Sequence, residues 1–329
     1  MVDIKCPVFV DIKYCLALDM MMIMFCLIFM MMNIIIALEE SKIPLPLLRL
    51  GLKLFDNNET MLNDVINNME EPQDVKIEDQ ILSLVQYKGD TSIGKLKGEF
   101  TSNDNYGLNR LDNVVNGTFI DIGANLGAIS IFVAKKYYTK NLQVICFEPI
   151  PVTYFLLRFN MHLNHIYHHQ NHTEHFNIST RTGPGMYAFN NAFGKEFATV
   201  NFVSSKTLSQ FSASSDKSVD DLNKENGLEW VSHKIVVVPL SFIESNFNIN
   251  VIDFLKLDCE GCEFDLIVSL EHFFKSKERL KYLGAEIHLS LMWPNEETIA
   301  KKPDTHVAEK ALNILRDRGC GKINWQINC

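Results

Sequence analysis

The sequence has no excess of basic residues. Its 31 Lys and Arg residues are outnumbered by 40 Asp and Glu residues, which gives a formal net charge of -9. It also contains no stripe of Lys or Arg interleaved with aromatic residues, and no internal repeat. This balance argues against a nucleic-acid scaffold and favours a small or neutral partner, because phosphate backbones are bound by clustered positive charge.

Charged residues are absent from residues 20–38, an almost wholly apolar stretch interrupted only by Asn33. About 19 apolar residues are enough for a helix to cross a bilayer. A buried core helix and a cleaved signal peptide are the alternatives, but Ile35-Ile-Ala37 is a poor cleavage site. We expect a single-pass anchor after a short tail at residues 1–19. Charges on the two flanks set the orientation poorly, and the short tail favours a lumenal position, in the Golgi or ER, for the large domain that follows.

The rest of the chain divides into a juxtamembrane region at residues 39–105 and a larger domain at residues 106–329. In the first part, Pro44 and Pro46 break any continuation of the anchor helix. Residues 47–55 and 81–87 are expected to form short helices. A hydrophobic fraction of 47% is ample for a packed core in the larger domain.

Apolar strands and helices alternate along the larger domain. This order predicts an α/β fold, a doubly wound sheet with helices on both faces and ligands at the carboxyl ends of its strands. Residues 117–163 read as strand, helix, strand, helix, and residues 164–185 and 204–227 read as a polar insertion and a surface loop. Further strands are expected at 186–190, 197–203, 234–238, 251–257 and 282–289, and helices at 241–247, 263–274 and 306–318.

A glycine turn follows the first strand of this domain. The segment Thr118-Phe-Ile-Asp-Ile-Gly-Ala-Asn-Leu-Gly-Ala128 runs from an apolar strand, through Gly123 and Gly127, into a helix. Asp121 and Asn125 are the polar residues at this turn. Such a turn bends sharply, lets a ligand approach bare backbone, and directs helix N–H groups at it. We therefore predict a nucleotide-type binding corner.

An acidic residue ends the next strand, where Phe147 is followed by Glu148 and Pro149. A carboxylate roughly 20 to 30 positions after a glycine turn is the expected partner of a ribose diol. The alternative is an ordinary strand-end carboxylate that caps the following helix. The turn and Glu148 together favour a ribose-bearing cofactor.

The densest group of carboxylates comprises Asp258, Glu260 and Glu263, around Gly261. Clustered carboxylates repel, so one of them can have a raised pKa and act as a general base toward a hydroxyl acceptor. The alternative is a strand-to-helix turn whose acidic residues cap the helix. Asp121, Glu148, Asp258 and His288 all lie near strand ends that converge on one edge of a parallel sheet.

Cysteine and histidine clusters raise the question of metal binding. Cys259 and Cys262 have Cys-x-x-Cys spacing, but no second cysteine pair is nearby, so we expect small buried thiols rather than a redox or zinc site. Cys320 and Cys329 could pair if the domain is lumenal. Six histidines fall between residues 162 and 175, where a zinc site and a solvated polar segment are the two alternatives, and we assign no metal to them. They are His162, His165, His168, His169, His172 and His175.

Five motifs, taken in order, match a known family. The chain resembles the FkbM-type family of S-adenosylmethionine-dependent methyltransferases over roughly residues 95 to 290. The glycine turn alone would fit any class I methyltransferase, whereas the Lys-Leu-Asp-x-Glu-Gly-x-Glu segment with Glu286 and His288 is more specific. The motifs are Phe119-Ile-Asp-Ile-Gly-Ala-Asn-Leu-Gly127, Phe147-Glu-Pro149, Asn191-Ala-Phe-Gly194, Val238-Pro-Leu240 and Leu255-Lys-Leu-Asp-Cys-Glu-Gly-Cys-Glu263.

The resemblance implies a seven-stranded Rossmann-like sheet that binds S-adenosylmethionine. The methionine moiety would be held by Asp121, Gly123, Asn125 and Gly127, the ribose by Glu148, and the adenine would lie beside Asn191 and Ala192. Asp258 would sit near the methyl group, with Glu260, Glu263 and His288 facing the acceptor. The chain departs from the family in having Cys259 and Cys262, where small apolar residues are usual.

Family members are typically O-methyltransferases for hydroxyls of sugars or natural products. The resemblance therefore implies transfer to a glycan or small-molecule hydroxyl, by direct displacement, with a carboxylate or His288 taking the proton. Two alternatives stay open: a non-catalytic domain that keeps the fold, and a nicotinamide-dependent oxidoreductase. The second lacks support because the turn does not have Gly-x-Gly-x-x-Gly spacing.

Overall fold

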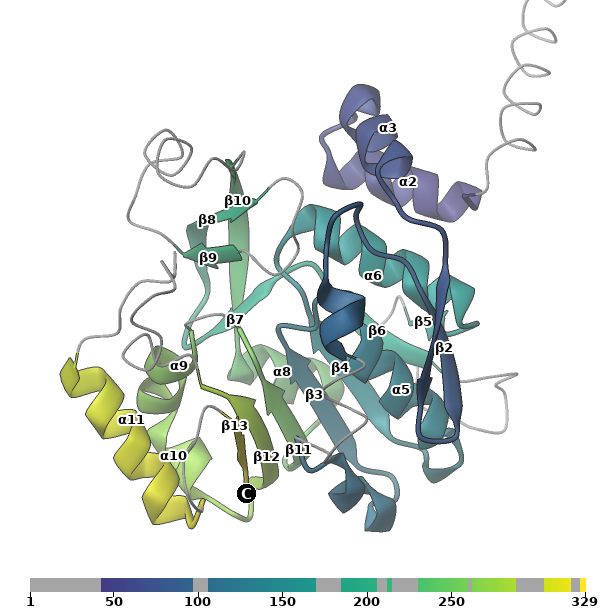
Figure 1. The fold of residues 1–329 in the computed structure, drawn as a ribbon. Coiled ribbons are helices and arrows are strands. Elements are labelled where there is room, and N and C mark those ends of the chain that lie inside the picture. The colour runs from purple at the N-terminus through teal and green to yellow at the C-terminus, as the bar shows by residue number, and fades with distance from the viewer. Residues whose placement is uncertain are drawn as a thin grey trace, which may run out of the picture.

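A mixed sheet flanked by helices forms the body of the molecule in the computed structural model (Figure 1). The structure describes residues 43–96, 106–169, 185–205, 212–214, 230–259, 262–287, 305–320 and 326–329. None of the helices in these ranges is long and apolar enough to cross a membrane. The anchor expected at residues 20–38 lies outside them.

The main sheet has seven strands in the order β13-β12-β11-β3-β4-β6-β5. All neighbours are parallel except β13, which pairs antiparallel with β12. The order reverses at β3, with β4 on one side and β11 on the other, so a ligand crevice is expected there. The expected mostly parallel α/β sheet is confirmed. The strands are β3 (Thr118–Ile122), β4 (Gln143–Phe147), β5 (Tyr167–His168), β6 (Gly185–Phe189), β11 (Ile252–Leu257), β12 (Leu280–Glu286) and β13 (Gln326–Asn328).

Side chains on the central strands alternate between two buried cores. In β3, Phe119 packs in one core while Ile120 and Ile122 pack in the other. This alternation follows from the two-residue period of a strand. Because both faces are covered, the central strands read as nearly continuous apolar runs.

Helices cover both faces of the sheet. The face of Phe119 is covered by α5 (Ala128–Lys136) and α6 (Pro151–Leu163), while α2 (Leu45–Leu54) packs against α6 and α3 (Glu59–Asn67) packs beside α2. The face of Ile120 is covered by α8 (Leu240–Phe247), α9 (Glu263–Ser269), α10 (Glu271–Lys275) and α11 (Thr305–Arg318). Two 3-10 turns, η1 (Leu108–Asn113) and η2 (Tyr138–Lys140), flank β3 and α5 in the sequence.

The region before the larger domain contains a hairpin where the sequence analysis expected a helix. Residues 81–87 were predicted to be helical, and that prediction was wrong. Gln80–Leu84 forms β2, which pairs antiparallel with β1 (Gln73–Ile77). Leu82 and Leu84 are buried and Ile81 is exposed, so the segment follows a strand period. Residues 43–96 share the core of Phe119, while the boundary near residue 105 stays a prediction.

A smaller sheet, in the order β7-β10-β8-β9, stands beside the main one (Figure 1). It contains the strands expected at 197–203 and 234–238, which are β8 (Ala198–Ser205) and β10 (Trp230–Pro239). The other two strands, β7 (Ala192–Gly194) and β9 (Ser212–Ser214), were not anticipated, and β9 lies within the expected loop at 204–227. The helix expected at 263–274 is divided at Leu270 into α9 and α10.

Two asparagines, one in α6 and one at its C-cap, hold the hairpin segment against that helix. Asn160 Oδ1 accepts the Val85 N–H at 2.7 Å, and its Nδ2 donates to the carbonyls of Val85 and Leu126. One turn later, Asn164 bonds both backbone groups of Ser83. The side-chain amides thus bond backbone groups of the hairpin segment, as a neighbouring strand would. The bond from Asn160 to the Leu126 carbonyl connects this network to the glycine turn.

We expect Asn160→Leu to destabilise the protein by about 3 kcal/mol, because it leaves buried backbone groups of Val85 and Leu126 without partners. Urea denaturation of the full-length chain measures this loss. The matched control is Asn246→Leu, at an exposed residue of α8, which should change the free energy of unfolding by no more than about 0.5 kcal/mol. Equal stability of both variants would contradict a docking role for Asn160.

Candidate active site

The glycine turn is built as the sequence predicts. Gly123 has φ of 80°, and a Cβ there would lie 1.7 Å from the carbonyl oxygen of Asp258, so only glycine fits. Gly127, with φ of 81°, is the N-cap of α5, and its missing side chain makes room for Leu157. The turn therefore packs tightly between the end of β11 and α6.

Glu148 lies at the end of β4 and is buried against the same turn. Its Oε2 accepts the Asn125 N–H and its Oε1 accepts the Ile150 N–H, both at 2.9 Å. Burial raises the pKa of Glu148 to about 7, although these two hydrogen bonds and the charge of Lys256 oppose the rise. A carboxyl group held at a fixed place, with a pKa near neutrality, is typical of a functional site.

Cavities open on two sides of the turn. The larger lies beside Glu148, with an empty volume of about 930 Å³ including its mouth, and the smaller, of about 680 Å³, lies on the α5 side, where Ala128 and Ile129 line it.

Gly123, Asn125 and Asp258 line the larger cavity together with Asn191 and Ala192, five of the residues that the sequence analysis assigned to the cofactor and its methyl group. The small sheet contributes an apolar wall that the sequence analysis missed, made of Val200, Phe202 and Val237. The cavity thus has polar groups at the strand ends on one side and this apolar wall on the other.

A buried ion cluster underlies the turn. Lys256 Nζ lies 3.0 Å from Asp121 Oδ1 and 3.4 Å from Asp258 Oδ2, and it donates to the Gly123 carbonyl at 2.9 Å. Burial alone would lower the pKa of Lys256, but the two carboxylates outweigh it and hold the pKa above its ordinary value. Asp121 also accepts the Ser130 hydroxyl at 2.7 Å. Asp121 therefore supports the turn from below and lines neither cavity.

Three further residues of the site escaped the sequence analysis as candidates. Lys256 was recognisable, as a lone cation within an apolar strand that ends in a carboxylate. Tyr106 carries no local signal, yet its hydroxyl lies 3.0 Å from Asp258 Oδ2. Glu286 at the end of β12 lies 3.4 Å from the same hydroxyl, so Tyr106 brings the ends of β11 and β12 together.

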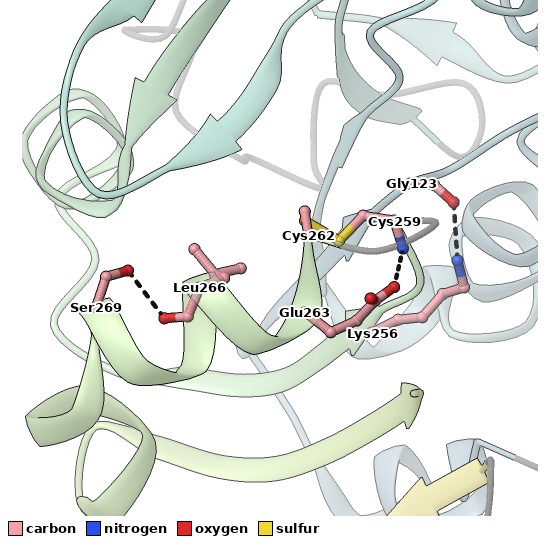
Figure 2. The surroundings of a disulfide bond; sticks show 7 residues. All are labelled: Gly123, Lys256, Cys259, Cys262, Glu263, Leu266 and Ser269. Atoms are coloured by element: carbon pink, nitrogen blue, oxygen red, sulfur yellow. Dashed lines mark hydrogen bonds between the residues drawn. A yellow bond between two sulfur atoms is a disulfide. The ribbon is translucent and has the colours of Figure 1, made fainter. Parts of the chain in front are cut away.

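Cys259 and Cys262 form a disulfide, so the expectation of separate buried thiols was wrong (Figure 2). The strand-to-helix turn brings their Cα atoms to 5.5 Å, which is within the range that a disulfide spans. Both cysteines line the larger cavity. Cys320 and Cys329 also pair, as the sequence analysis allowed.

Glu263 does not face either cavity. It is fully buried, and its Oε1 accepts the Cys259 N–H at 2.9 Å (Figure 2). Its carboxylate closes the turn before α9. The sequence analysis left open a cap on the helix itself, but Cys262, the N-cap of α9, has no side-chain cap hydrogen bond. Glu260 and His288, the other two candidates, lie outside the described residues.

The histidine-rich segment is described only as far as His169. His168 lies at an edge strand, and burial lowers its pKa to about 4. His172 and His175 lie outside the described residues. Within the described part of the chain, no group of three or more His, Cys, Asp or Glu residues could hold a metal ion.

The raised pKa of Glu148 makes stability depend on pH. Between about pH 4.5 and pH 7 the folded state keeps a proton on Glu148 that the unfolded state releases, so the contribution of Glu148 to the free energy of unfolding falls as pH rises. His168 contributes in the opposite sense, because burial lowers its pKa to about 4 and the unfolded state holds a proton that the folded state releases. We therefore expect the wild type to lose about 3 kcal/mol relative to Glu148→Gln across this window, with Glu59→Gln following the wild type. Urea denaturation at a series of pH values measures this difference, and equal pH dependence of the wild type and Glu148→Gln would contradict the assignment.

Comparisons with known proteins agree with the position of this site. Residues 121–289, more than half of the chain, match the family described as methyltransferase FkbM domain. Among solved structures, the METTL16 MTase domain (crystal form 2) is similar with a TM-score of 0.33 and 10% identity, over 83% of this chain and 85% of that chain. None of the curated proteins compared with the chain matches it. The match from Asp121 of the glycine turn to beyond β12 places the chain in the FkbM methyltransferase family.

Proposed function

We propose that the protein is an S-adenosylmethionine-dependent O-methyltransferase that acts on a hydroxyl group of a glycan or small molecule. The observation that carries this proposal is the buried carboxyl of Glu148 beside the glycine turn. Its two backbone hydrogen bonds leave each oxygen with further capacity to accept, which suits the two hydroxyls of a ribose.

The residues around the larger cavity fit the cofactor. The Oδ1 atom of Asn125 is buried and has no hydrogen-bond partner within the described residues, so it can accept a hydrogen bond from a ligand. Asn191 and Ala192 border the apolar wall, where a flat adenine ring would pack. When bound, S-adenosylmethionine supplies a methyl group that is already activated by the sulfonium centre.

Asp258 is the described residue best placed to act on the acceptor. It lines both cavities, and its side chain is 23% exposed, so an acceptor hydroxyl can approach it. Lys256 and Tyr106 fix one of its oxygens. We assign Asp258 to orient the acceptor hydroxyl and take its proton. Glu260 and His288 stay candidates for the same step.

Binding of the cofactor tests this proposal. Glu148→Gln should weaken S-adenosylmethionine by at least about tenfold, because hydrogen bonds to a charged group are lost. The wild type should bind about tenfold more weakly at pH 6 than at pH 8, since the carboxylate form is about tenfold scarcer there. Isothermal titration calorimetry measures both changes in affinity. In Glu148→Gln, the affinity should vary with pH only through ionisation of the ligand itself. Absence of binding by the wild type would refute the cofactor assignment.

Transfer of a tritiated methyl group to fractionated membrane glycans and lipids tests turnover. We expect Asp258→Asn to lose transfer even at saturating S-adenosylmethionine. Binding without transfer to any fraction would favour the non-catalytic alternative. A nicotinamide-dependent oxidoreductase would instead enhance NADH fluorescence, and the family match argues against it.

We further propose that residues 20–38 anchor the chain in the Golgi or ER membrane with the catalytic domain in the lumen. Support comes from the apolar run and from the two disulfides, which persist in oxidising compartments. The protein should stay in membranes after alkaline carbonate extraction. Sequons at Asn58, Asn116, Asn171 and Asn177 should give a glycosidase-sensitive mass shift in a lumenal domain. Release by carbonate would contradict the anchor, and protease digestion of the domain in sealed vesicles would contradict its orientation.

A further inference from the structure

One wall of the larger cavity contains the disulfide between Cys259 and Cys262 (Figure 2). Cys259 follows Asp258 after the end of β11, and Cys262 is the N-cap of α9. Both cysteines are half-buried and line the cavity, so a small solute in the cavity can reach the disulfide. The other disulfide that the structure describes is different, because Cys320 is buried and neither Cys320 nor Cys329 lines either of the two cavities.

Asp258 does not depend on this disulfide for its position. Its N–H donates to the Ile122 carbonyl at 3.0 Å. Its carboxylate lies 3.4 Å from Lys256 Nζ and 3.0 Å from the Tyr106 hydroxyl. Opening the disulfide therefore leaves in place the residue that we assign to the acceptor hydroxyl, and it changes the part of the wall that follows this residue.

The disulfide restrains the turn between β11 and α9. The ends of this turn are joined by the two sulfur atoms and by the Cys259 N–H, which donates to Glu263 Oε1 at 2.9 Å. When the sulfur–sulfur bond is broken, this part of the wall gains conformational freedom, which a bound ligand must remove again. Ordering the backbone of one residue costs about a factor of ten in an equilibrium constant. Glu148 and Asn191 line the same cavity, so this cost lowers the affinity for a cofactor held there.

Exposure and loop length both make this disulfide the easier of the two to reduce. Cys259 and Cys262 are 3 positions apart in the sequence, whereas Cys320 and Cys329 are 9 apart. A disulfide that closes a shorter loop removes less chain entropy from the unfolded state and is therefore stabilised less. An accessible disulfide is also attacked faster by thiolates than a buried one. The disulfide at the cavity therefore suits reversible exchange.

Exchange with a small thiol proceeds in two steps. A thiolate attacks one sulfur of the pair, the bond between Cys259 and Cys262 breaks, and the departing cysteine thiolate takes up the proton that the small thiol lost on ionisation. A second thiolate attacks the mixed disulfide at the sulfur of the small thiol and releases the other cysteine, which is protonated in the same way. Two electrons thus pass from two thiol molecules to the cysteine pair, and the two thiols leave as one disulfide.

We propose that the Cys259–Cys262 disulfide is a site of exchange with low-molecular-weight thiols, and that its reduction weakens cofactor binding in the larger cavity. The inference rests on the proposed function and adds a means of regulating the same site. It concerns two positions at which this chain departs from the small apolar residues that are usual in the family. The ratio of thiol to disulfide in the compartment then sets the fraction of the protein that binds the cofactor tightly.

Binding of S-adenosylhomocysteine to the full-length protein tests this coupling. Isothermal titration calorimetry at pH 8 compares the oxidised wild type with the wild type reduced by dithiothreitol, and reduction should raise the dissociation constant about tenfold.

Equilibration in glutathione buffers, followed by alkylation and mass spectrometry, gives the ratio of thiol to disulfide at which each cysteine pair is half reduced. The Cys259–Cys262 pair should be reduced in less reducing buffers than the Cys320–Cys329 pair. Saturating S-adenosylhomocysteine should shift the midpoint of the Cys259–Cys262 pair about tenfold toward more reducing buffers, because the coupling between ligand binding and reduction is reciprocal. An unshifted midpoint in the wild type would contradict the coupling without the use of any variant.

Two double variants assign the effect to one disulfide. The variant with Cys320→Ser and Cys329→Ser should keep the effect of dithiothreitol on affinity, and the variant with Cys259→Ala and Cys262→Ala should lose it. Equal affinity of the oxidised and reduced wild type, or an effect of dithiothreitol that persists without Cys259 and Cys262, would overturn the proposal. Failure of the oxidised wild type to bind S-adenosylhomocysteine would instead refute the proposed function itself.

Discussion

A buried ammonium group holds the two central strand ends of the site together. Lys256 on β11 stands in register with Asp121 on β3, and its Nζ also reaches Asp258 and the Gly123 carbonyl. Burying an isolated charge costs several kcal/mol, so this lysine is stable only beside both carboxylates. The hydrogen bond from Lys256 Nζ to the Gly123 carbonyl also sets the direction in which the peptide groups of the turn point. Both cavities depend on that direction, because both are lined by the turn.

The cluster carries an excess of negative charge at the place where the proposed chemistry occurs. Two carboxylates surround Lys256, and Glu286 lies within reach of the same Tyr106 hydroxyl as Asp258. At low effective dielectric such an excess favours a cationic ligand. A sulfonium cofactor meets this condition, and it also favours the ionised form of Glu148. Lys256 therefore stabilises the fold of the turn, and the negative charge that Lys256 does not neutralise favours binding of a cationic ligand.

The sequence predicted the parts of the site that are encoded locally. The glycine turn, the strand that ends in Glu148 and the alternation of strands with helices all follow from spacing and apolar pattern. Contacts between distant segments could not be predicted in this way: Tyr106 joins Asp258 across 152 residues of sequence. The helix prediction for residues 81–87 was wrong because a short apolar run fits both the helical and the strand period. Pairing with β1 stabilises the strand. The sequence analysis wrongly placed Glu263 at the acceptor. Its side chain is buried by tertiary packing, which a local sequence pattern does not show.

The docking of the hairpin on α6 has a consequence for the order in which the chain folds. Val85 and Asn160, and likewise Ser83 and Asn164, are bonded across 75 and 81 residues. An isolated hairpin is at best marginally stable in water, so β1 and β2 cannot persist before α6 has been synthesised. During synthesis the N-terminal part must wait for the glycine turn and α6, and its docking closes a long loop. The face of the smaller cavity that Ser92 and Leu96 line is thus completed last, after the glycine turn on which it packs.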